Sequence, residues 1–316
     1  MPDKLSAIRP AVVIPLYKPE LSASERLSIE RSVDVLASRS LFIVGPDRLR
    51  EALDALRRPF GPRLQLKTFP DRYFAGIKGY NALMRSLDFY RSFADHSHVL
   101  IAQTDALVIS DQLDPWCARD WSYIGAPWFV GGSQPRRPLE FFGVGNGGFS
   151  LRRLTDFLRV LETPRRIPNF IKSRAGGSAG FPNLVRRIKH ERILAYNIEP
   201  FFPSSNEDFF WGVLVPAACP FFRVPRPEDA VAFAFEAEPR HLYAMNGNVL
   251  PFGCHAWEKF DPAFWEEQLP FLGHSARGHL SLGRGGAMTS RRPYQVRHPP
   301  RCNCVDNDRR ARTRRG

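Results

Sequence analysis

The sequence predicts an α/β fold built around a doubly wound, Rossmann-like sheet flanked by helices. Short apolar runs alternate with helical spacings of apolar residues over residues 11–109. Such an alternation implies parallel strands joined by right-handed crossovers. The chain has 316 residues, of which 43% are hydrophobic, and this is ample for a core. The length fits an α/β enzyme domain of about 250 residues followed by a tail.

Four apolar runs are the predicted strands of this sheet, at residues 11–17, 40–45, 64–69 and 98–109. Between them, apolar residues recur three or four positions apart, as on the buried face of an amphipathic helix. The first of these helices follows Ser22 and Glu25, which have the spacing of a capping box.

Beyond this sheet the regular alternation ends. Residues 121–128 are typical of another strand that ends in a turn. Residues 206–215 and 227–236 open with Asn or Pro followed by acids, which favours helix starts, and Asn206 is the expected cap. Residues 261–269 predict a last short helix.

The stretch from His98 to Ile109 is apolar on both sides of one polar interruption, Gln103 to Asp105. Burying an unpaired carboxylate costs several kcal/mol or more, roughly, so we expect Asp105 at a strand end, bound to a cationic group. The alternative is that Asp105 only caps the turn that follows.

In such sheets ligands bind beyond the carboxyl ends of the strands. This rule places Tyr17, Asp71 and Asp105 on one rim, with Arg72 and Lys78 as nearby cations. Residues 11–109 contain neither G-x-G-x-x-G nor a P-loop, which disfavours a dinucleotide site or a Walker-type phosphate site at this rim.

Residues 141–153 contain four glycines within six positions. Glycine lets the backbone approach a ligand closely or adopt positive φ, and a tight structural turn explains the cluster equally well. Residues 163–190 are rich in Pro, Gly and Arg without a period, and predict a mobile loop over the rim.

The formal net charge is +13, but eleven Arg and two Asp in residues 271–316 place nine of these charges there. The preceding part is therefore near neutral, and we expect no specific nucleic acid partner. The segment 273–316 is predicted to be a disordered Arg-rich tail, which either contacts anionic lipid at a membrane surface or has no function.

No apolar stretch is long enough to span a membrane, and the N-terminus lacks the apolar core of a signal peptide. The five Cys are odd in number and show no disulfide spacing. We therefore expect a cytoplasmic protein. Cys302 and Cys304, near His298, form only a weak metal-binding pattern.

Several residues on the rim could together perform group transfer. Asp105 and His255, completed by diphosphate oxygens, would suit Mg²⁺ or Mn²⁺. Such a cation would neutralise a leaving diphosphate. A carboxylate at Glu207 or Asp208 could act as general base, although helix capping would explain one of these acids. Trp257 could supply a stacking wall, with a core position as the alternative.

Five segments carry a resemblance to a known family. AVVIPLYKPE, QTDALV, GNGGFSLRR, NEDFFW and LPFGCHAWEKF, in this order, resemble the GT-A-like family, a domain of unknown function found in predicted glycosyltransferases. The resemblance covers about residues 11–270 and implies one GT-A-like catalytic domain at 1–272, with the mixed sheet of that fold, followed by the tail at 273–316.

The resemblance implies transfer of a sugar from a nucleotide sugar donor to a hydroxyl of a carbohydrate or glycan acceptor. Asp208, or failing that Glu207, would be the base of an inverting reaction. Asn146, Gly147 and Gly148 would shape the pocket.

The metal motif of that family maps onto QTD. Asp105 would match its last Asp and bind Mn²⁺ or Mg²⁺ or the donor, with His255 as the second protein ligand, while Tyr17 and Asp71 would lie beside the nucleoside. The first Asp of the motif is Gln103 here, and a neutral amide is a weaker ligand for a hard cation. Lys78 or an arginine could stabilise the leaving group instead.

Two other interpretations stay open. A nucleotidyl or phosphoryl transferase shares the α/β sheet and a metal, but would need a Gly-rich loop after the first strand, where PLYKPELSASE has no Gly. A non-catalytic carbohydrate-binding module would use its acids only as helix caps. Wide separation of Asp105, Asp208 and His255 would favour the module.

Overall fold

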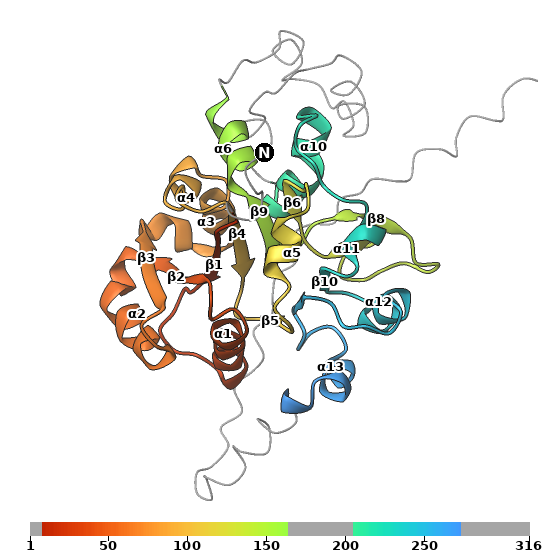
Figure 1. Cartoon of the computed structure of the whole chain (residues 1–316), viewed down its shortest axis with the longest axis horizontal. Coiled ribbons are helices and arrows are strands. Elements are labelled where there is room, and N and C mark those ends of the chain that lie inside the picture. Colours follow the sequence, from red (N-terminus) through yellow and green to blue (C-terminus); the bar gives the residue numbers. More distant parts are fainter. Residues whose placement is uncertain (1–7, 164–204, 273–316) are drawn as a thin grey trace, which may run out of the picture. The chain divides into compact units, whose positions relative to one another are not determined.

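The computed structural model describes residues 8–163 and 205–272, which belong to one compact unit (Figure 1). The described residues form a mixed sheet in the order β3-β2-β1-β4-β9-β6. Its strands are β1 (Pro10–Pro15), β2 (Ser40–Pro46), β3 (Leu64–Phe69), β4 (His98–Ala102), β6 (Tyr123–Ile124) and β9 (Phe149–Arg153). The first four run parallel, whereas β9 is antiparallel to β4 and β6. The predicted α/β class with a mixed sheet flanked by helices is confirmed.

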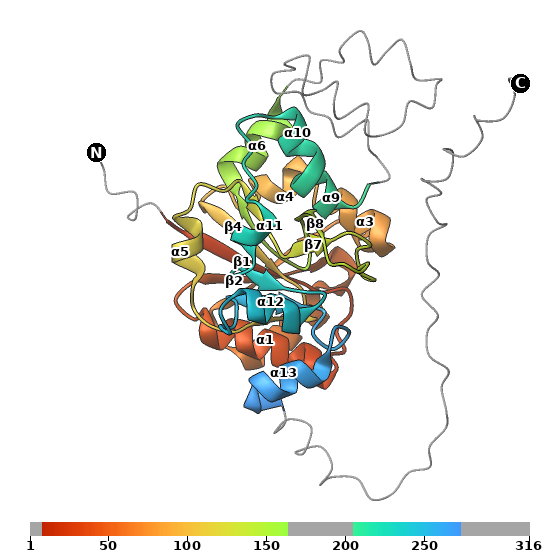
Figure 2. The same ribbon diagram turned by 90° about the vertical axis from the view of Figure 1, so that its right-hand side faces the viewer.

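Helices cover both faces of this sheet (Figures 1 and 2). In β1, Val13 faces a core cluster with Phe89 and Phe157, whereas Val12 faces another with Ile29 and Leu53. The first cluster includes α3 (Gly76–Leu83), α4 (Leu87–Arg91) and α6 (Leu154–Glu162); the second includes α1 (Ala23–Val35), α2 (Arg50–Arg57) and α5 (Leu113–Cys117). Short 3-10 turns are η2 (Asp47–Leu49), η3 (Arg58–Phe60) and η4 (Asp71–Phe74).

The predicted caps had different outcomes. Ser22 and Glu25 form the expected capping box at the start of α1. Asn206 makes no side-chain capping bond; its Oδ1 instead accepts a hydrogen bond from Asn81 at 3.3 Å. The predicted helix at 206–215 is α9 (Glu207–Phe209), the π-helical η6 (Phe210–Leu214) and α10 (Val215–Ala218).

The single strand predicted at 98–109 is wrong, because the polar residues after Ala102 break it in two. A turn bond from the Ala106 amide to the Gln103 carbonyl closes at 2.9 Å. The next strand, β5 (Ala106–Val108), then joins a different sheet, with β11 (Gly253–His255) and β10 (Ala234–Phe235).

Two further predicted elements are also divided. Residues 121–128 split between β6 and β7 (Pro127–Phe129), and β7 pairs with β8 (Phe141–Val144). Residues 227–236 contain only a short α11 (Pro227–Ala230), because Ala234 and Phe235 pair with β11 as β10. The last helices are α12 (Pro239–Met245) and α13 (Pro262–Gln268), and the latter confirms the helix predicted at 261–269.

Some predictions fall on residues that the structure does not describe. These are the tail at 273–316 with its Cys302, Cys304 and His298, and nearly all of the loop at 163–190. Within the described ranges, no helix combines the length and apolar character needed to cross a membrane.

Candidate functional site

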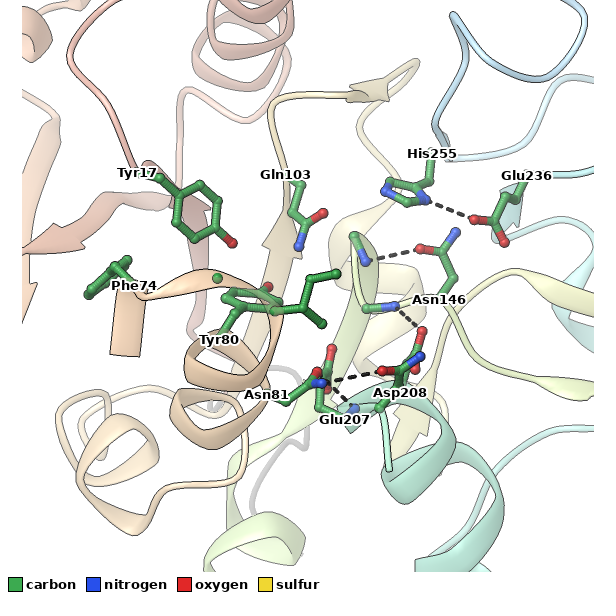
Figure 3. Close-up of a pocket in the computed structure, with 15 residues that line it drawn as sticks. Tyr17, Phe74, Tyr80, Asn81, Gln103, Asn146, Glu207, Asp208, Glu236 and His255 are labelled. Carbon is green, nitrogen blue, oxygen red and sulfur yellow. Dashed lines mark hydrogen bonds and ion pairs between the residues drawn. The ribbon is translucent and has the colours of Figure 1, made fainter. Parts of the chain in front are cut away.

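A pocket of about 520 Å³ opens where β1 and β4 end, as the strand-end rule predicts (Figure 3). Segments far apart in the sequence form its walls. The side chains and backbone that line it come from Tyr17, Phe74, Gly76, Ile77, Tyr80, Asn81, Gln103, Asn146, Gly147, Gly148, Asn206, Glu207, Asp208, Glu236 and His255.

The glycine-rich loop between β8 and β9 lies at the centre of the site. Asn146 has a φ of 76°, and its side-chain oxygen accepts bonds from the amides of Gly148 at 3.0 Å and Phe149 at 3.3 Å. A Cβ on Gly147 would lie 2.0 Å from Oε1 of Glu207, and a Cβ on Gly148 would lie 2.0 Å from Nε2 of His255. The glycines are therefore required because site residues approach the backbone on two sides.

His255 lies between two carboxylates. Because β11 pairs with β5, His255 is opposite Ala106, the residue after Asp105. Its Nε2 lies 3.2 Å from Oδ1 of Asp105, and its Nδ1 lies 3.0 Å from Oε1 of Glu236. Burial alone would lower the pKa of His255, but the two carboxylates raise it to about 10. Burial alone would raise the pKa of Asp105, but His255 holds it below its ordinary value.

The Asp105 and His255 pair fits a divalent cation. Oδ1 of Asp105 and Nε2 of His255 are buried and face each other at 3.2 Å, and neither atom makes a further hydrogen bond among the described residues. Neighbouring ligands on an octahedral ion with bonds of about 2.1 Å lie about 3 Å apart, close to the observed separation. Glu236 on the other ring nitrogen would orient the imidazole, as carboxylates do for metal-bound histidines.

Among the described residues, Asp105 and His255 are the two candidate ligands for such a cation. The described residues contain no group of three or more His, Cys, Asp and Glu side chains that could hold a metal. Oxygens of a ligand or water would therefore have to complete its coordination.

Asp208 lies across the glycine loop from His255. Its Oδ2 accepts a hydrogen bond from the Gly147 amide at 3.2 Å, and its Oδ1 accepts one from the Phe209 amide at 2.8 Å. Burial raises the pKa of Asp208, although both amides oppose the rise. A half-buried carboxylate with a raised pKa that lines a pocket is suited to accept a proton.

Glu207 is fully packed and paired. Its Oε1 accepts a bond from the buried Arg152 at 2.9 Å, and both side chains are at most 3% exposed. Arg152 also donates to the hydroxyl of Tyr90 at 2.9 Å. Burial raises the pKa of Glu207, with Arg152 opposing the rise and Asp208 adding to it. Glu207 thus pairs with a buried cation, whereas Asp208 accepts its hydrogen bonds from backbone amides.

Aromatic side chains form the opposite wall of the pocket (Figure 3). The ring of Tyr17 lies edge-on to Phe74 and Tyr80, with both centroid distances at 5.9 Å. Tyr17 is 39% exposed and Ile77 is 74% exposed, so this wall presents apolar surface to the pocket.

Most of the predicted site residues meet in this pocket. Those that line it are Tyr17, Gln103, Asn146, Gly147, Gly148, Glu207, Asp208 and His255, and Asp105 contacts His255.

Four predicted residues do not line the pocket: Asp105, which contacts it through His255, and three others. Asp71 accepts a bond from the Arg48 amide at 3.0 Å, and Lys78 is an exposed residue of α3. Trp257 is 7% exposed and packs in a core cluster with Trp265.

Sequence reasoning missed Glu236, Arg152 and Asn81. Glu236 was assigned to a helix, and only the pairing of β10 with β11 brings it to His255. Arg152 lies within the quoted GNGGFSLRR segment, and its burial depends on the distant Glu207. Asn81 accepts a bond from the Glu207 amide at 3.1 Å. A local pattern could not have signalled these long-range partners.

Residues 63–255 match the model of a family described as "Protein of unknown function (DUF5672)". No curated protein matches the sequence. The fold is similar to the galactosyltransferase LgtC, solved with donor and acceptor sugar analogues, at 13% identity and a TM-score of 0.45, over 78% of this chain and 86% of that one.

Two other solved structures are similar at the same level. The glycosyltransferase GlyE of Streptococcus pneumoniae TIGR4 has 13% identity and a TM-score of 0.43, over 86% of this chain and 63% of that one. Mouse xyloside xylosyltransferase 1 has 11% identity and a TM-score of 0.42, over 78% of this chain and 97% of that one.

Proposed function

We propose that this chain, which belongs to the DUF5672 family of proteins of unknown function, transfers a sugar from a nucleoside diphosphate sugar to an acceptor hydroxyl. The observation that carries the proposal is the convergence of His255, the glycine loop and Asp208 on one pocket, with Asp105 in contact with His255. Its volume of about 520 Å³ lies in the range of small-molecule sites, roughly 300–1,000 Å³.

The donor is proposed to occupy the pocket from the aromatic wall to the glycine loop. Tyr17, Phe74 and Tyr80 would receive the nucleoside, since rings and an apolar surface suit a base. The diphosphate would reach Asp105 and His255, which would hold Mn²⁺ or Mg²⁺. When bound, such a cation neutralises the charge that builds up on the diphosphate as its bond to the sugar breaks.

Asp208 is proposed as the general base. It would take the proton of the acceptor hydroxyl while that oxygen bonds to the anomeric carbon and the diphosphate leaves with the electron pair of the broken bond. Attack from the side opposite the diphosphate inverts the configuration. Glu207 is less suited to this role, because its Oε1 is paired with Arg152 and its side chain is only 3% exposed. It acts instead as a positioning residue behind the glycine loop.

A non-catalytic binding module would place its acids only as helix caps. Asp208 instead bonds the glycine loop, and it lines the same pocket as His255. The geometry therefore favours the transferase over the module.

A thermal-shift screen of nucleoside diphosphate sugars, with and without Mn²⁺, tests the donor site. A ligand selective for the native state raises the melting temperature. We expect one nucleotide class to raise it in a Mn²⁺-dependent manner, and Asp105→Ala to abolish that rise. Val249→Ala is the control, because Val249 is 61% exposed and lines neither the donor pocket nor the adjoining cavity. No response from any nucleotide sugar would contradict the proposal.

A further inference from the structure

A second cavity, of about 690 Å³, adjoins the donor pocket. The two cavities share three wall residues, Asn206, Asp208 and Glu236. The carboxylate that we assign as base therefore borders both spaces. A group bound in the second cavity would contact Asp208 but not the proposed nucleoside wall, because Tyr17, Phe74 and Tyr80 do not line this cavity.

Three aromatic rings form one wall of this second cavity. Phe142 is stacked against Phe209 with an interplanar angle of 6° and a centroid distance of 6.3 Å. It is also stacked against Trp128, at 23° and 6.5 Å. At these distances the rings are nearly parallel and offset from one another, and together they form an apolar surface. We call Trp128, Phe142 and Phe209 the aromatic platform.

One ring of the platform is open to solvent. Phe142 is 53% exposed, which is high for a large apolar side chain within the described part of the chain. Exposed apolar patches with a polar rim mark binding sites more often than plain surface does. Here the rim consists of Asn206, Asp208 and Glu236.

The rim determines the charge class of the occupant. Two carboxylates and an amide oxygen accept hydrogen bonds from hydroxyl groups, and the carboxylates repel an anionic ligand. Arg136 is the one basic residue among the described lining residues, so the two carboxylates outnumber it. A pyranose ring satisfies both walls, because its C–H face is apolar and its edge carries hydroxyls.

We propose that the aromatic platform binds the pyranose ring of a neutral glycan acceptor and presents one of its hydroxyls to Asp208. This inference rests on the proposed transferase function and names its acceptor class. The bound hydroxyl gives its proton to Asp208, its oxygen bonds to the anomeric carbon of the donor sugar, and the bond from that carbon to the diphosphate breaks.

Saturation-transfer difference NMR with methyl pyranosides of glucose, galactose, mannose and xylose tests the platform. We expect at least one pyranoside to bind the full chain. Phe142→Ala should weaken this binding about tenfold or more, a factor that corresponds to about 1.4 kcal/mol. Phe142→Tyr keeps the ring and should restore the binding. Val249→Ala is the matched control, since it removes an exposed apolar side chain outside both cavities. Equal binding to the wild type and Phe142→Ala, or no binding to the wild type, would overturn the proposal.

Donor binding, measured on the same variants by thermal shift, separates this inference from the proposed function. An unchanged donor response in Phe142→Ala, together with lost pyranoside binding, supports a distinct acceptor site. Equal loss of donor and pyranoside binding would overturn it, because Phe142 would then serve the donor pocket or the fold. Absence of any donor response in the wild type would contradict the transferase function, while the pyranoside signal would still decide whether the platform binds sugars.

Discussion

Two adjacent carboxylates, Glu207 and Asp208, differ in role because their surroundings differ. Glu207 is buried against Arg152, whereas Asp208 bonds two backbone amides and faces both cavities. The resemblance ranks Asp208 ahead of Glu207, but no local pattern gives the physical reason for this order, because Arg152, the partner of Glu207, lies 55 positions away. The same limit explains Asp71 and Trp257, which the strand-end rule and residue type favoured, although the side chains point to other partners.

Arg152→Met should destabilise the fold strongly. The variant leaves the Glu207 carboxylate buried without its cation, a change that costs about 3–5 kcal/mol. Arg91→Met is the control, since Arg91 is 58% exposed in its pair with Glu162 and such surface pairs contribute about 0–1 kcal/mol. Urea unfolding at pH 8 measures both free energies of unfolding. Equal losses in the two variants would show that the buried pair has no special role.

The loss in Arg152→Met should shrink as the pH falls. Burial raises the pKa of Glu207 to about 7, above its value in the unfolded chain. The stability that comes from protonating this buried carboxyl is therefore full below the unfolded pKa and is lost as the pH rises through the folded one. At low pH the carboxyl is neutral, so the variant no longer buries an unpaired charge. Urea unfolding of the variant and of the wild type at pH 5 and at pH 8 measures the loss at each pH. A larger loss at pH 5 than at pH 8 would contradict this sign.

The pH dependence of turnover should show the raised pKa of Asp208. A base works when deprotonated, so kcat should fall as the pH drops through that pKa, and this limb should lie above the ordinary range of an aspartate. Initial rates of nucleoside diphosphate release across pH 3.5 to 9 would measure it, with the folded state checked by fluorescence at each pH. A rate independent of pH down to the ordinary aspartate pKa, about 3.9, would exclude Asp208 as the base.

At the scale of elements, the apolar runs that became β1 and β2 could be predicted because these two strands are buried almost throughout, whereas β3 lies at the edge of the sheet and buries only Leu64 and Phe69. The end of β4 could not be predicted, because it depends on distant partners. The Gln103 amide bonds the Gly148 carbonyl at 2.8 Å, and the next strand, β5, pairs with β11. The short strands β10 and β11 pair over long sequence separations, and no local period marks them. In the glycine cluster the positive φ falls on Asn146 and on none of the four glycines, and Gly147 and Gly148 are needed because Glu207 and His255 pack against them. Close approach of a ligand to this loop stays a prediction.

Gly148→Ala should weaken donor binding through His255. Its Cβ would lie 2.0 Å from Nε2, so the imidazole must leave its present position 3.2 Å from Asp105. We expect at least a tenfold loss of Mn²⁺-dependent donor affinity, about 1.4 kcal/mol, by isothermal titration calorimetry. Gly143→Ala is the matched control in β8, where the nearest atom is a Val213 methyl at 4.0 Å. Unchanged affinity in Gly148→Ala would remove His255 from the donor site.

At the scale of the whole molecule, the described residues contain both cavities, while the positive charge concentrates in residues 271–316. We therefore predict that removal of residues 273–316 leaves donor binding and turnover unchanged. Thermal-shift and product-release assays on the truncated and full chains would measure this. A truncated chain that folds but no longer binds donor would place part of the site in the removed segment.

Turnover by Asp208→Asn, compared with the wild type at saturating donor, tests most directly whether one pocket combines donor binding with a base. The variant should bind the donor with unchanged affinity and release nucleoside diphosphate about 10²- to 10⁴-fold more slowly in the presence of acceptor, because only the proton transfer is lost. Wild-type rates in Asp208→Asn, or a loss of donor binding as large as the loss of rate, would contradict the assignment.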